Sequence, residues 1–228
     1  MSIKTKHSKN YLITAATFEE IQLLFQYLKK NYNFKKINTQ HFVFDVHNHH
    51  WHLVITGVGM VSTSYHLGKL SANKYDWAVN IGIAGAFDKA LKIGEIVIIQ
   101  EDIFSEMGAE DGSHFIPLSQ LHLGNEKIIP KKLFVPKFFS YIKTVKAITV
   151  NTVHGKLSSI KKVTKLYQPQ VETMESAAFY FACEQNKWKN CVIRSISNYV
   201  EKRNKDKWNI PLAIKNLNDL MIRFIEQS

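Results

Sequence analysis

Hydrophobic residues along the chain gather in short runs that alternate with segments of helical spacing. Residues 11–16 are apolar without alternation, which is typical of a strand buried on both faces of a sheet. Thr17 follows this run and Glu20 stands three residues later, so the pair predicts a capping box at the start of a helix. Apolar side chains at helical spacing over residues 23–28 supply the face with which this helix packs against a core.

The rest of the chain continues the same alternation. Two apolar runs on either side of a polar turn at residues 47–50 predict a β-hairpin. We expect strands at residues 42–46, 51–55, 77–81, 96–99, 147–150 and 191–196, and helices over residues 61–73, 175–186 and 211–225. Strands and helices that alternate in this way predict an α/β sandwich around a largely buried sheet.

Residues 108–136 stand apart, because their glycines and prolines follow no helix or strand spacing. A connection of this length usually forms a binding loop or an interface arm. The chain otherwise contains no linker, repeat or low-complexity segment. We therefore expect one domain over residues 1–228.

Composition and charge narrow the class of protein. The chain has 228 residues, of which 45% are hydrophobic, and this excludes wholesale disorder. Lys and Arg number 30 against 19 Asp and Glu, which gives a net charge of +11. The lysines are spread along the chain, and no zinc finger, KH-type loop or RNP-like run accompanies them. We favour an ordinary basic surface over a nucleic-acid-binding one and expect no nucleic-acid partner.

Cysteine content and hydropathy indicate the compartment. Residues 1–10 are polar and lack the apolar stretch of a signal peptide. No apolar run approaches the roughly 20 residues that cross a bilayer. Cys183 and Cys191 cannot form a disulfide framework and match no zinc-binding spacing. We expect a cytoplasmic protein with no membrane partner.

The histidines are the first candidates for chemistry. His47, His49, His50 and His52 gather around the predicted hairpin turn. A metal site needs convergent ligands that other groups orient, and this turn offers few other ligands. We therefore expect solvated histidines, with no metal and no cofactor.

Two glycine-rich turns follow predicted strands. Gly57 and Gly59 open a helix, but Ser62 stands where a dinucleotide fingerprint has its third glycine. A tight strand-to-helix turn and a site for an anion or polar ligand remain equally open there. Ile83, Ala84 and Gly85 follow the run 77–81, and such small residues let a ligand approach the backbone closely.

Two carboxylates are more informative. Glu172 and Glu175 precede a helix that is too apolar to lie on the surface, so we expect both side chains near a buried edge. A buried carboxylate needs a partner, and sugar hydroxyls would supply hydrogen-bond donors. Stabilisation of a helix N-terminus by the acidic side chain is an equally good explanation.

Six segments together resemble a known family. In chain order they are residues 17–20 (TFEE), 56–59 (TGVG), 80–85 (NIGIAG), 91–97 (LKIGEIV), 174–178 (MESAA) and 194–198 (RSISN). Over nearly the whole chain they resemble the nucleoside phosphorylase and nucleosidase superfamily, in particular the branch of methylthioadenosine/S-adenosylhomocysteine nucleosidases and futalosine hydrolases. The resemblance implies a three-layer α/β sandwich with a central mixed, partly barrel-like sheet flanked by helices. It also implies a small-molecule purine nucleoside as partner and a homodimer or larger homo-oligomer.

The resemblance also implies roles for individual residues. Glu20 matches the general base that activates the attacking water, Met174 the residue packed under the ribose, and Glu175 the carboxylate that binds ribose hydroxyls. Thr152, Val153 and His154 would line the purine slot through their backbone.

Two further residues receive roles at the edges of the site. Phe115 lies in the irregular segment and matches an arm that closes the partner's site. Arg203, or a lysine near it, is a candidate for the benzoate end of a futalosine substrate.

Asn198 departs from the adenine-specific nucleosidases, which have a catalytic Asp at this place. An Asp can protonate N7 of the poorly leaving 6-aminopurine, whereas Asn only donates and accepts hydrogen bonds. Across the superfamily, Asn at this position accompanies 6-oxopurines. Ile83 is a second departure, because methylthioadenosine nucleosidases usually have a Ser there. Asn198 thus favours a hypoxanthine nucleoside such as futalosine.

The residues also favour hydrolysis over phosphorolysis. Phosphorylases of the family hold phosphate with arginine, and this chain has Asn80 before the glycine-rich turn and no basic residue over 82–87. We expect a futalosine hydrolase of menaquinone biosynthesis that needs no cofactor. The alternatives are a methylthioadenosine/S-adenosylhomocysteine nucleosidase and a non-catalytic nucleoside-binding protein.

Overall fold

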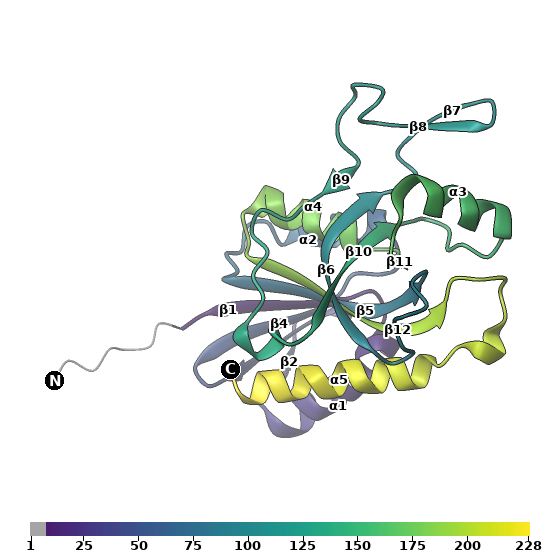
Figure 1. The fold of residues 1–228 in the computed structure, drawn as a ribbon. Helices are drawn as coiled ribbons and strands as arrows, with labels where there is room; N and C mark the ends of the chain where they lie inside the picture. Colours follow the sequence, from purple (N-terminus) through teal and green to yellow (C-terminus); the bar gives the residue numbers. More distant parts are fainter. Residues whose placement is uncertain (1–7) are drawn as a thin grey trace.

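The computed structural model describes residues 8–228 (Figure 1), so most of the polar N-terminal segment considered above lies outside the described residues. The strands of the main sheet are β1 (Asn10–Ala15), β2 (Lys35–Lys36), β3 (His41–Val46), β4 (His49–Ile55), β5 (Trp77–Ala86), β6 (Ile96–Phe104), β9 (Lys127–Ile128), β10 (Lys143–Thr149), β11 (Val171–Thr173) and β12 (Asn190–Tyr199). A separate hairpin contains β7 (Gly108–Asp111) and β8 (His114–Pro117). The helices are α1 (Phe18–Asn31), α2 (Met60–Lys69), α3 (Leu157–Tyr167), α4 (Ser176–Asn186) and α5 (Ile210–Glu226), with short 3-10 turns at Lys137–Phe139 and Lys205–Lys207.

The main sheet is mixed and partly closed. Its order is β11-β10-β6-β12-β5-β1-β4-β3-β2, with β9 paired to β6. β11 runs parallel to β10 and also pairs antiparallel with β5. The five strands β5, β12, β6, β10 and β11 therefore form a closed ring, while the strands from β1 to β2 continue as an open sheet. This confirms the mixed, partly barrel-like sheet that the family resemblance implies.

Helices cover the sheet in two groups. α1 and α5 lie together along one side of the sheet in Figure 1, and their residues Leu24 and Leu217 are buried in one apolar core. α2 and α4 pack against each other, and Leu67 and Phe179 are buried in a second core. The sheet thus lies between two helical layers, as expected.

Two polar contacts fix the start of α1. The predicted capping box is present: the Glu20 N–H donates to Oγ1 of Thr17 at 3.3 Å, and the Thr17 N–H donates to the Glu20 carboxylate at 3.1 Å. The buried amide of Asn218 on α5 donates to the carbonyl of Glu20 and accepts from the N–H of Leu24, at 2.8 Å each. These bonds tie the first turn of α1 to α5.

Several predicted elements have different ends. The strand predicted at residues 77–81 continues to Ala86, because Gly82 and the residues after it pair with neighbouring strands. The strand predicted at 191–196 continues to Tyr199 across a bulge at Ser197. The helix predicted over 61–73 is Met60–Lys69, since tighter turn bonds follow it from Leu70.

Other predictions need correction in the loops. The hairpin turn consists of His47 and Asn48, both with positive φ, so His49 and His50 belong to β4 and not to a four-residue turn. The irregular segment 108–136 contains the β7–β8 hairpin, which projects from the body of the molecule in Figure 1. Helix α3 and strand β11 were not predicted. Within residues 8–228, no helix is long and apolar enough to cross a membrane.

Candidate active site

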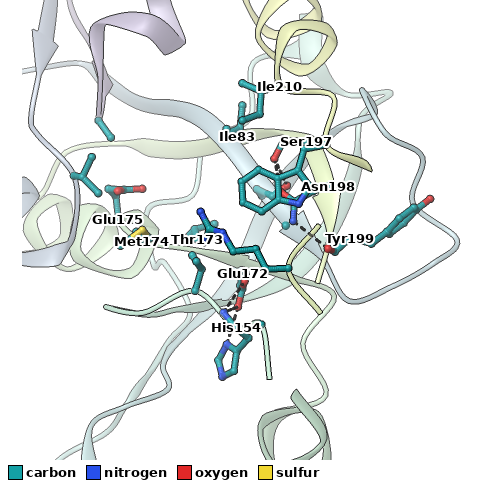
Figure 2. A pocket seen from close by; sticks show the side chains of 18 of the residues that line it. Ile83, His154, Glu172, Thr173, Met174, Glu175, Ser197, Asn198, Tyr199 and Ile210 are labelled. Atoms are coloured by element: carbon teal, nitrogen blue, oxygen red, sulfur yellow. Dashed lines mark hydrogen bonds and ion pairs between the residues drawn. The ribbon is translucent and has the colours of Figure 1, made fainter. Parts of the chain in front are cut away.

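One cavity of about 410 Å³ lies where several strands of the sheet end (Figure 2). The turn after β1, the last residues of β5 and β12, and the segment from β11 to α4 border it. Crevices at the carboxyl ends of parallel strands are the usual place for ligands in α/β proteins. The lining residues are Ala16, Thr17, Glu20, Val58, Ile83, Ala84, Gly85, Val153, His154, Gly155, Glu172, Thr173, Met174, Glu175, Ser197, Asn198, Tyr199, Glu201, Arg203, Trp208 and Ile210.

Glu20 lies in the first turn of α1 and is 9% exposed. Its Oε2 accepts hydrogen bonds from the N–H groups of Ala16 and Thr17, and its Oε1 accepts one from the N–H of Ile83, each at 3.1 Å. A Cβ on Gly82 would stand 2.7 Å from Oε1, so only glycine lets the carboxylate approach β5 this closely. Three backbone donors therefore orient Glu20 at the cavity wall.

The surroundings of Glu20 shift its acidity. Burial raises its pKa above the ordinary glutamate value, the positive charge of Arg194 opposes this shift, and the negative charge of Glu175 adds to it. A general base works best when its pKa lies close to the working pH. The raised pKa therefore makes Glu20 a better proton acceptor than an exposed glutamate.

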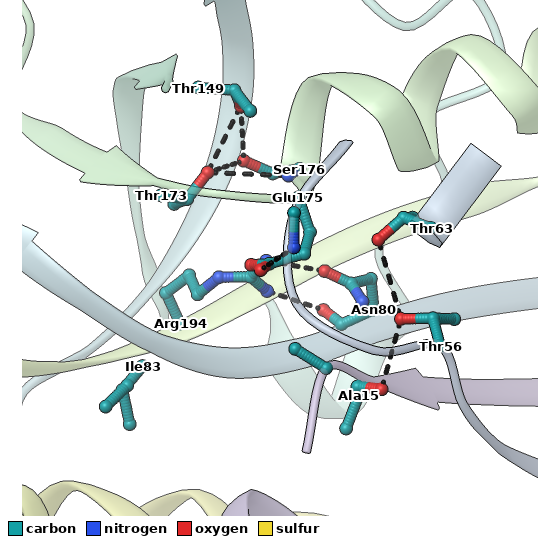
Figure 3. A network of polar contacts seen from close by, with 12 residues as sticks. Ala15, Thr56, Thr63, Asn80, Ile83, Thr149, Thr173, Glu175, Ser176 and Arg194 are labelled. Atoms are coloured by element: carbon teal, nitrogen blue, oxygen red, sulfur yellow. Dashed lines mark hydrogen bonds and ion pairs between the residues drawn. The ribbon is translucent and has the colours of Figure 1, made fainter. Parts of the chain in front are cut away.

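Arg194 is a buried cation beside Glu175 (Figure 3). Its Nη2 lies 3.8 Å from Oε2 of Glu175, and its Cζ and the Glu20 carboxylate both lie against Gly82. Nη1 donates to the carbonyl of Asn80 at 3.2 Å, and Nη2 donates to the Asn80 side-chain oxygen. No residue of the described chain accepts from Nε. Arg194 is thus held in place by Asn80 and balances the two buried carboxylates.

Glu175 stands just before α4 and is 7% exposed. Its Oε1 accepts a hydrogen bond of 3.0 Å from the N–H of Gly59, which has a φ of 91°. The glycine turn between β4 and α2 therefore directs a backbone donor to a carboxylate of the protein itself. Met174, the preceding residue, lines the same part of the cavity.

A buried network holds the start of α4. Asp102 on β6 is fully buried and accepts hydrogen bonds from the hydroxyls of Ser176 and Thr149 and from the N–H of Ile103. Burial raises the pKa of Asp102 to about 6, and these hydrogen bonds lower it in part. The Thr149 hydroxyl also accepts from the N–H of Ala177, so the network ties β6 and β10 to the segment that carries Glu175.

Asn198 lies at the opposite end of the cavity from Glu175 (Figure 2). The bulge at Ser197 shifts the register of β12 so that Asn198 pairs with Gly85. Its Oδ1 accepts from the Ser197 hydroxyl at 2.8 Å, and its Nδ2 donates to the Tyr199 carbonyl at 3.1 Å. An amide has two donors and two acceptor sites, so one hydrogen and one lone pair remain for a ligand.

The sequence of the chain matches a known family. A model of the phosphorylase superfamily matches residues 10–226, nearly the whole chain. The chain belongs to the phosphorylase superfamily. The resemblance inferred from the six sequence segments is thereby confirmed.

The chain is similar to relatives of two kinds. The chain is 30% identical to a 5′-methylthioadenosine/S-adenosylhomocysteine nucleosidase of Buchnera aphidicola subsp. Baizongia pistaciae, over 98% of this chain and 93% of that protein. It is 24% identical to a futalosine hydrolase of Thermus thermophilus, over 71% of this chain and 75% of that protein. The native structure of a Helicobacter pylori futalosine hydrolase has a TM-score of 0.79 and 14% identity, and covers 96% of this chain and 98% of that one. The shared fold confirms the predicted fold class.

Most of the site residues that the sequence predicts lie around the cavity of about 410 Å³. They are Glu20, Ile83, Ala84, Gly85, Val153, Glu172, Met174, Glu175, Asn198 and Arg203. Thr152 is exposed and does not line the cavity. Phe115 on β8 lines a separate cavity of about 360 Å³ next to α3.

Sequence reasoning missed Arg194 and Trp208 at this site, and for His154 it predicted a backbone contact with the purine but not the side-chain bond to Glu172. Arg194 had a signal, because it is the one charged residue in the apolar run 191–196. The His154 side chain bonds to Glu172, and the Trp208 ring lies 4.9 Å from the Arg203 guanidinium, but neither contact has a spacing signal. In residues 8–228, no three His, Cys, Asp or Glu side chains are placed to hold a metal ion.

Proposed function

We propose that the chain is a purine nucleoside N-ribosyl hydrolase that cleaves futalosine to hypoxanthine and dehypoxanthine futalosine in menaquinone biosynthesis. One observation supports this most directly: the amide of Asn198 and the carboxylates of Glu20 and Glu175 border the same cavity. The carboxylates suit the sugar, and the amide suits a base that leaves without a strong acid.

In the proposed reaction, a water molecule attacks C1′ of the ribose and gives a proton to Glu20. Glu175 accepts hydrogen bonds from the ribose hydroxyls, while Met174 packs beneath the sugar. The glycosidic bond breaks with positive charge on the ribose, and the two buried carboxylates stabilise that charge electrostatically. The positive charge of Arg194 lies 3.8 Å from the Glu175 carboxylate and opposes the rise that burial causes in the pKa of Glu20.

The chemistry of the leaving group supports a 6-oxopurine as the nucleobase. A departing 6-oxopurine spreads negative charge onto O6, so it needs hydrogen bonds more than a full proton transfer. The free hydrogen of Asn198 Nδ2 can supply one of these bonds. The neighbouring Ile83 offers no hydroxyl to orient a catalytic acid, in keeping with an amide at position 198.

Water suits this cavity better than phosphate as the nucleophile. Glu20 and Glu175 carry negative charge at the place where a nucleophile must approach the sugar, and they would repel phosphate. Arg194 is engaged with Asn80 and Glu175, and the Arg203 guanidinium lies against Trp208. The guanidinium beside the two carboxylates is therefore not free to hold phosphate.

A methylthioadenosine/S-adenosylhomocysteine nucleosidase is the second candidate. The 30% identity to the Buchnera nucleosidase over nearly both whole chains favours it. Asn198 argues against it, because an amide cannot protonate adenine at N7. A non-catalytic nucleoside-binding protein is a third possibility, and the retained Glu20 and Glu175 argue against that one.

The deciding experiment incubates the purified protein separately with futalosine and with methylthioadenosine and identifies the released base by chromatography. We expect hypoxanthine from futalosine at a rate that added phosphate does not raise. Adenine release from methylthioadenosine with no hypoxanthine from futalosine would favour the second candidate. If neither substrate releases a base, the non-catalytic nucleoside-binding protein remains as the candidate.

A further inference from the structure

Glu175 stands at the start of α4 but does not cap this helix. The residue at this position usually accepts a hydrogen bond from a backbone N–H of the first turn with its own side chain. The Glu175 side chain makes no such bond and accepts instead from the N–H of Gly59. Other groups must therefore satisfy the first N–H groups of α4.

Two threonine hydroxyls take the place of this cap. The N–H of Ala177 donates to Oγ1 of Thr149 at 2.9 Å, and the N–H of Ser176 lies 3.4 Å from Oγ1 of Thr173. Figure 3 shows these hydroxyls and that of Ser176 joined beside Glu175. Because Thr149 ends strand β10, a distant part of the sheet holds the helix, and the Glu175 side chain is left to face the cavity.

Asp102 fixes the direction of these hydrogen bonds. It is fully buried on β6, where Oδ1 accepts from the Thr149 hydroxyl at 3.0 Å and Oδ2 accepts from the Ser176 hydroxyl. Its pKa is about 6, so at neutral pH the side chain is mostly ionised and only accepts hydrogen bonds. A hydroxyl has one hydrogen, and the hydrogen of Thr149 points to Asp102. The Thr149 oxygen therefore keeps its lone pairs for the N–H of Ala177.

We propose that Asp102 is a positioning residue for Glu175: through Thr149 and Ser176 it holds the start of α4 so that the Glu175 carboxylate faces the sugar of the substrate. The inference rests on the proposed function in taking Glu175 as the acceptor for the ribose hydroxyls. Asp102 does not line the cavity and touches neither sugar nor base. Its influence should therefore appear with ligands that contain a ribose and not with free bases.

The inference is tested by measuring the binding of formycin A, formycin B, adenine and hypoxanthine to the full chain by calorimetry. The formycins are purine nucleoside analogues in which a carbon–carbon bond joins base and ribose, so they present a ribose that hydrolysis cannot remove. Asp102→Asn puts an NH2 group where a carboxylate oxygen accepts, so only one of the two hydroxyls can still donate to it. We expect this variant to bind the formycins at least about fivefold more weakly and the free bases within about twofold, as for a weakened hydrogen bond to a charged group.

Two comparisons separate positioning from a general loss of structure. Glu126 is also a buried carboxylate, and it accepts from the N–H and hydroxyl of Ser119 at 2.9 Å each without lining the cavity. Glu126→Gln should therefore keep the wild-type binding of all four ligands. If Asp102 acts through Glu175, Asp102→Asn should weaken formycin binding no further in a Glu175→Gln protein, because the two substitutions remove the same contact.

A second pair of variants serves if Asp102→Asn does not fold. Thr149→Val keeps the shape of the side chain but removes the hydroxyl between Asp102 and the N–H of Ala177. Thr149→Ser keeps that hydroxyl. We expect the Val variant to lose formycin binding and keep base binding, and the Ser variant to keep both.

The outcomes distinguish this inference from the proposed function. Equal weakening of formycins and free bases in Asp102→Asn overturns the positioning role, even if the wild-type protein hydrolyses futalosine. Unchanged formycin binding, or a further loss in the Glu175→Gln protein, does the same. A loss confined to the formycins together with no futalosine turnover by the wild-type protein supports the inference and contradicts the proposed substrate.

Discussion

The substitution Glu20→Gln tests the proposed general base most directly. Gln is nearly the same size as Glu but cannot take a proton from water. Positioned general bases contribute about 10²- to 10⁴-fold to rates. The Glu20 carboxylate is oriented by three backbone donors, so we expect kcat to fall by about 10³-fold.

The effect of Glu20→Gln on stability follows from the same three hydrogen bonds. The new NH2 group must face a backbone N–H, and the smaller loss occurs if it turns toward the single donor of Ile83. One unsatisfied contact costs about 1–3 kcal/mol. The loss of a negative charge beside Glu175 offsets part of this cost. The melting temperature should fall by no more than about 10 °C, so the variant remains folded.

The assay compares initial rates of base release and, separately, binding of the product base. Glu19→Gln is the matched control, because Glu19 lies in the same turn of α1 and is exposed. It should keep the wild-type rate, whereas Glu20→Gln should bind the base and release almost none. A Glu20→Gln rate within tenfold of the wild-type rate would refute the assignment of the base.

Three further predictions concern the rest of the site. Asn198→Asp should shift kcat/KM toward adenine nucleosides by tenfold or more, and no shift in a paired-substrate assay would contradict the role of the amide. Gly82→Ala places a methyl group 2.7 Å from the Glu20 carboxylate and should lower kcat at least tenfold in the same assay, whereas Gly68→Ala in α2 has free space and should not. Burial raises the pKa of Asp102 to about 6, above about 3.9 in the unfolded chain, so the folded protein holds this proton more tightly. The contribution of this group to stability therefore falls as pH rises from about 4 to about 6, and urea unfolding of Asp102→Asn should lack that part of the pH dependence; an unchanged slope would refute it.

The acidity of Glu20 gives a last prediction. The base must be ionised to accept a proton, and its pKa is raised by burial. Activity should therefore be lost on acidification at a higher pH than an ordinary glutamate would give, which is about 4.3. A profile of kcat/KM against pH measures this loss of activity on the acidic side. A midpoint at or below the ordinary value would contradict the buried, desolvated base.

The parts of the fold that the sequence predicts are those with strong local signals. The Thr17–Glu20 capping box and the apolar stripe of α1 depend on neighbouring residues, and both are present in the structure. The strand that the sequence predicts over residues 77–81 stops at Gly82. Gly82 lies inside β5, since its lack of a side chain serves Glu20, which is distant in sequence.

The site shows the same limit. Sequence motifs indicated Glu20, Glu175 and Asn198, which stand next to recognisable turns and strand ends. Neither the closure of β11 onto β5 nor the contact of His154 with Glu172 follows from spacing, because each joins segments that meet only in the folded chain. Tertiary pairing of this kind overrides local propensity.

The closed ring of five strands has an evolutionary consequence. Glu172 and Asn198 are separated by one strand and not by a loop, so backbone hydrogen bonds set the distance between them. Changes of loop length elsewhere therefore leave that distance intact, because the strands and not the connections hold both positions. Exchanges of side chain at the cavity wall and changes in the outer loops can thus accumulate independently of each other.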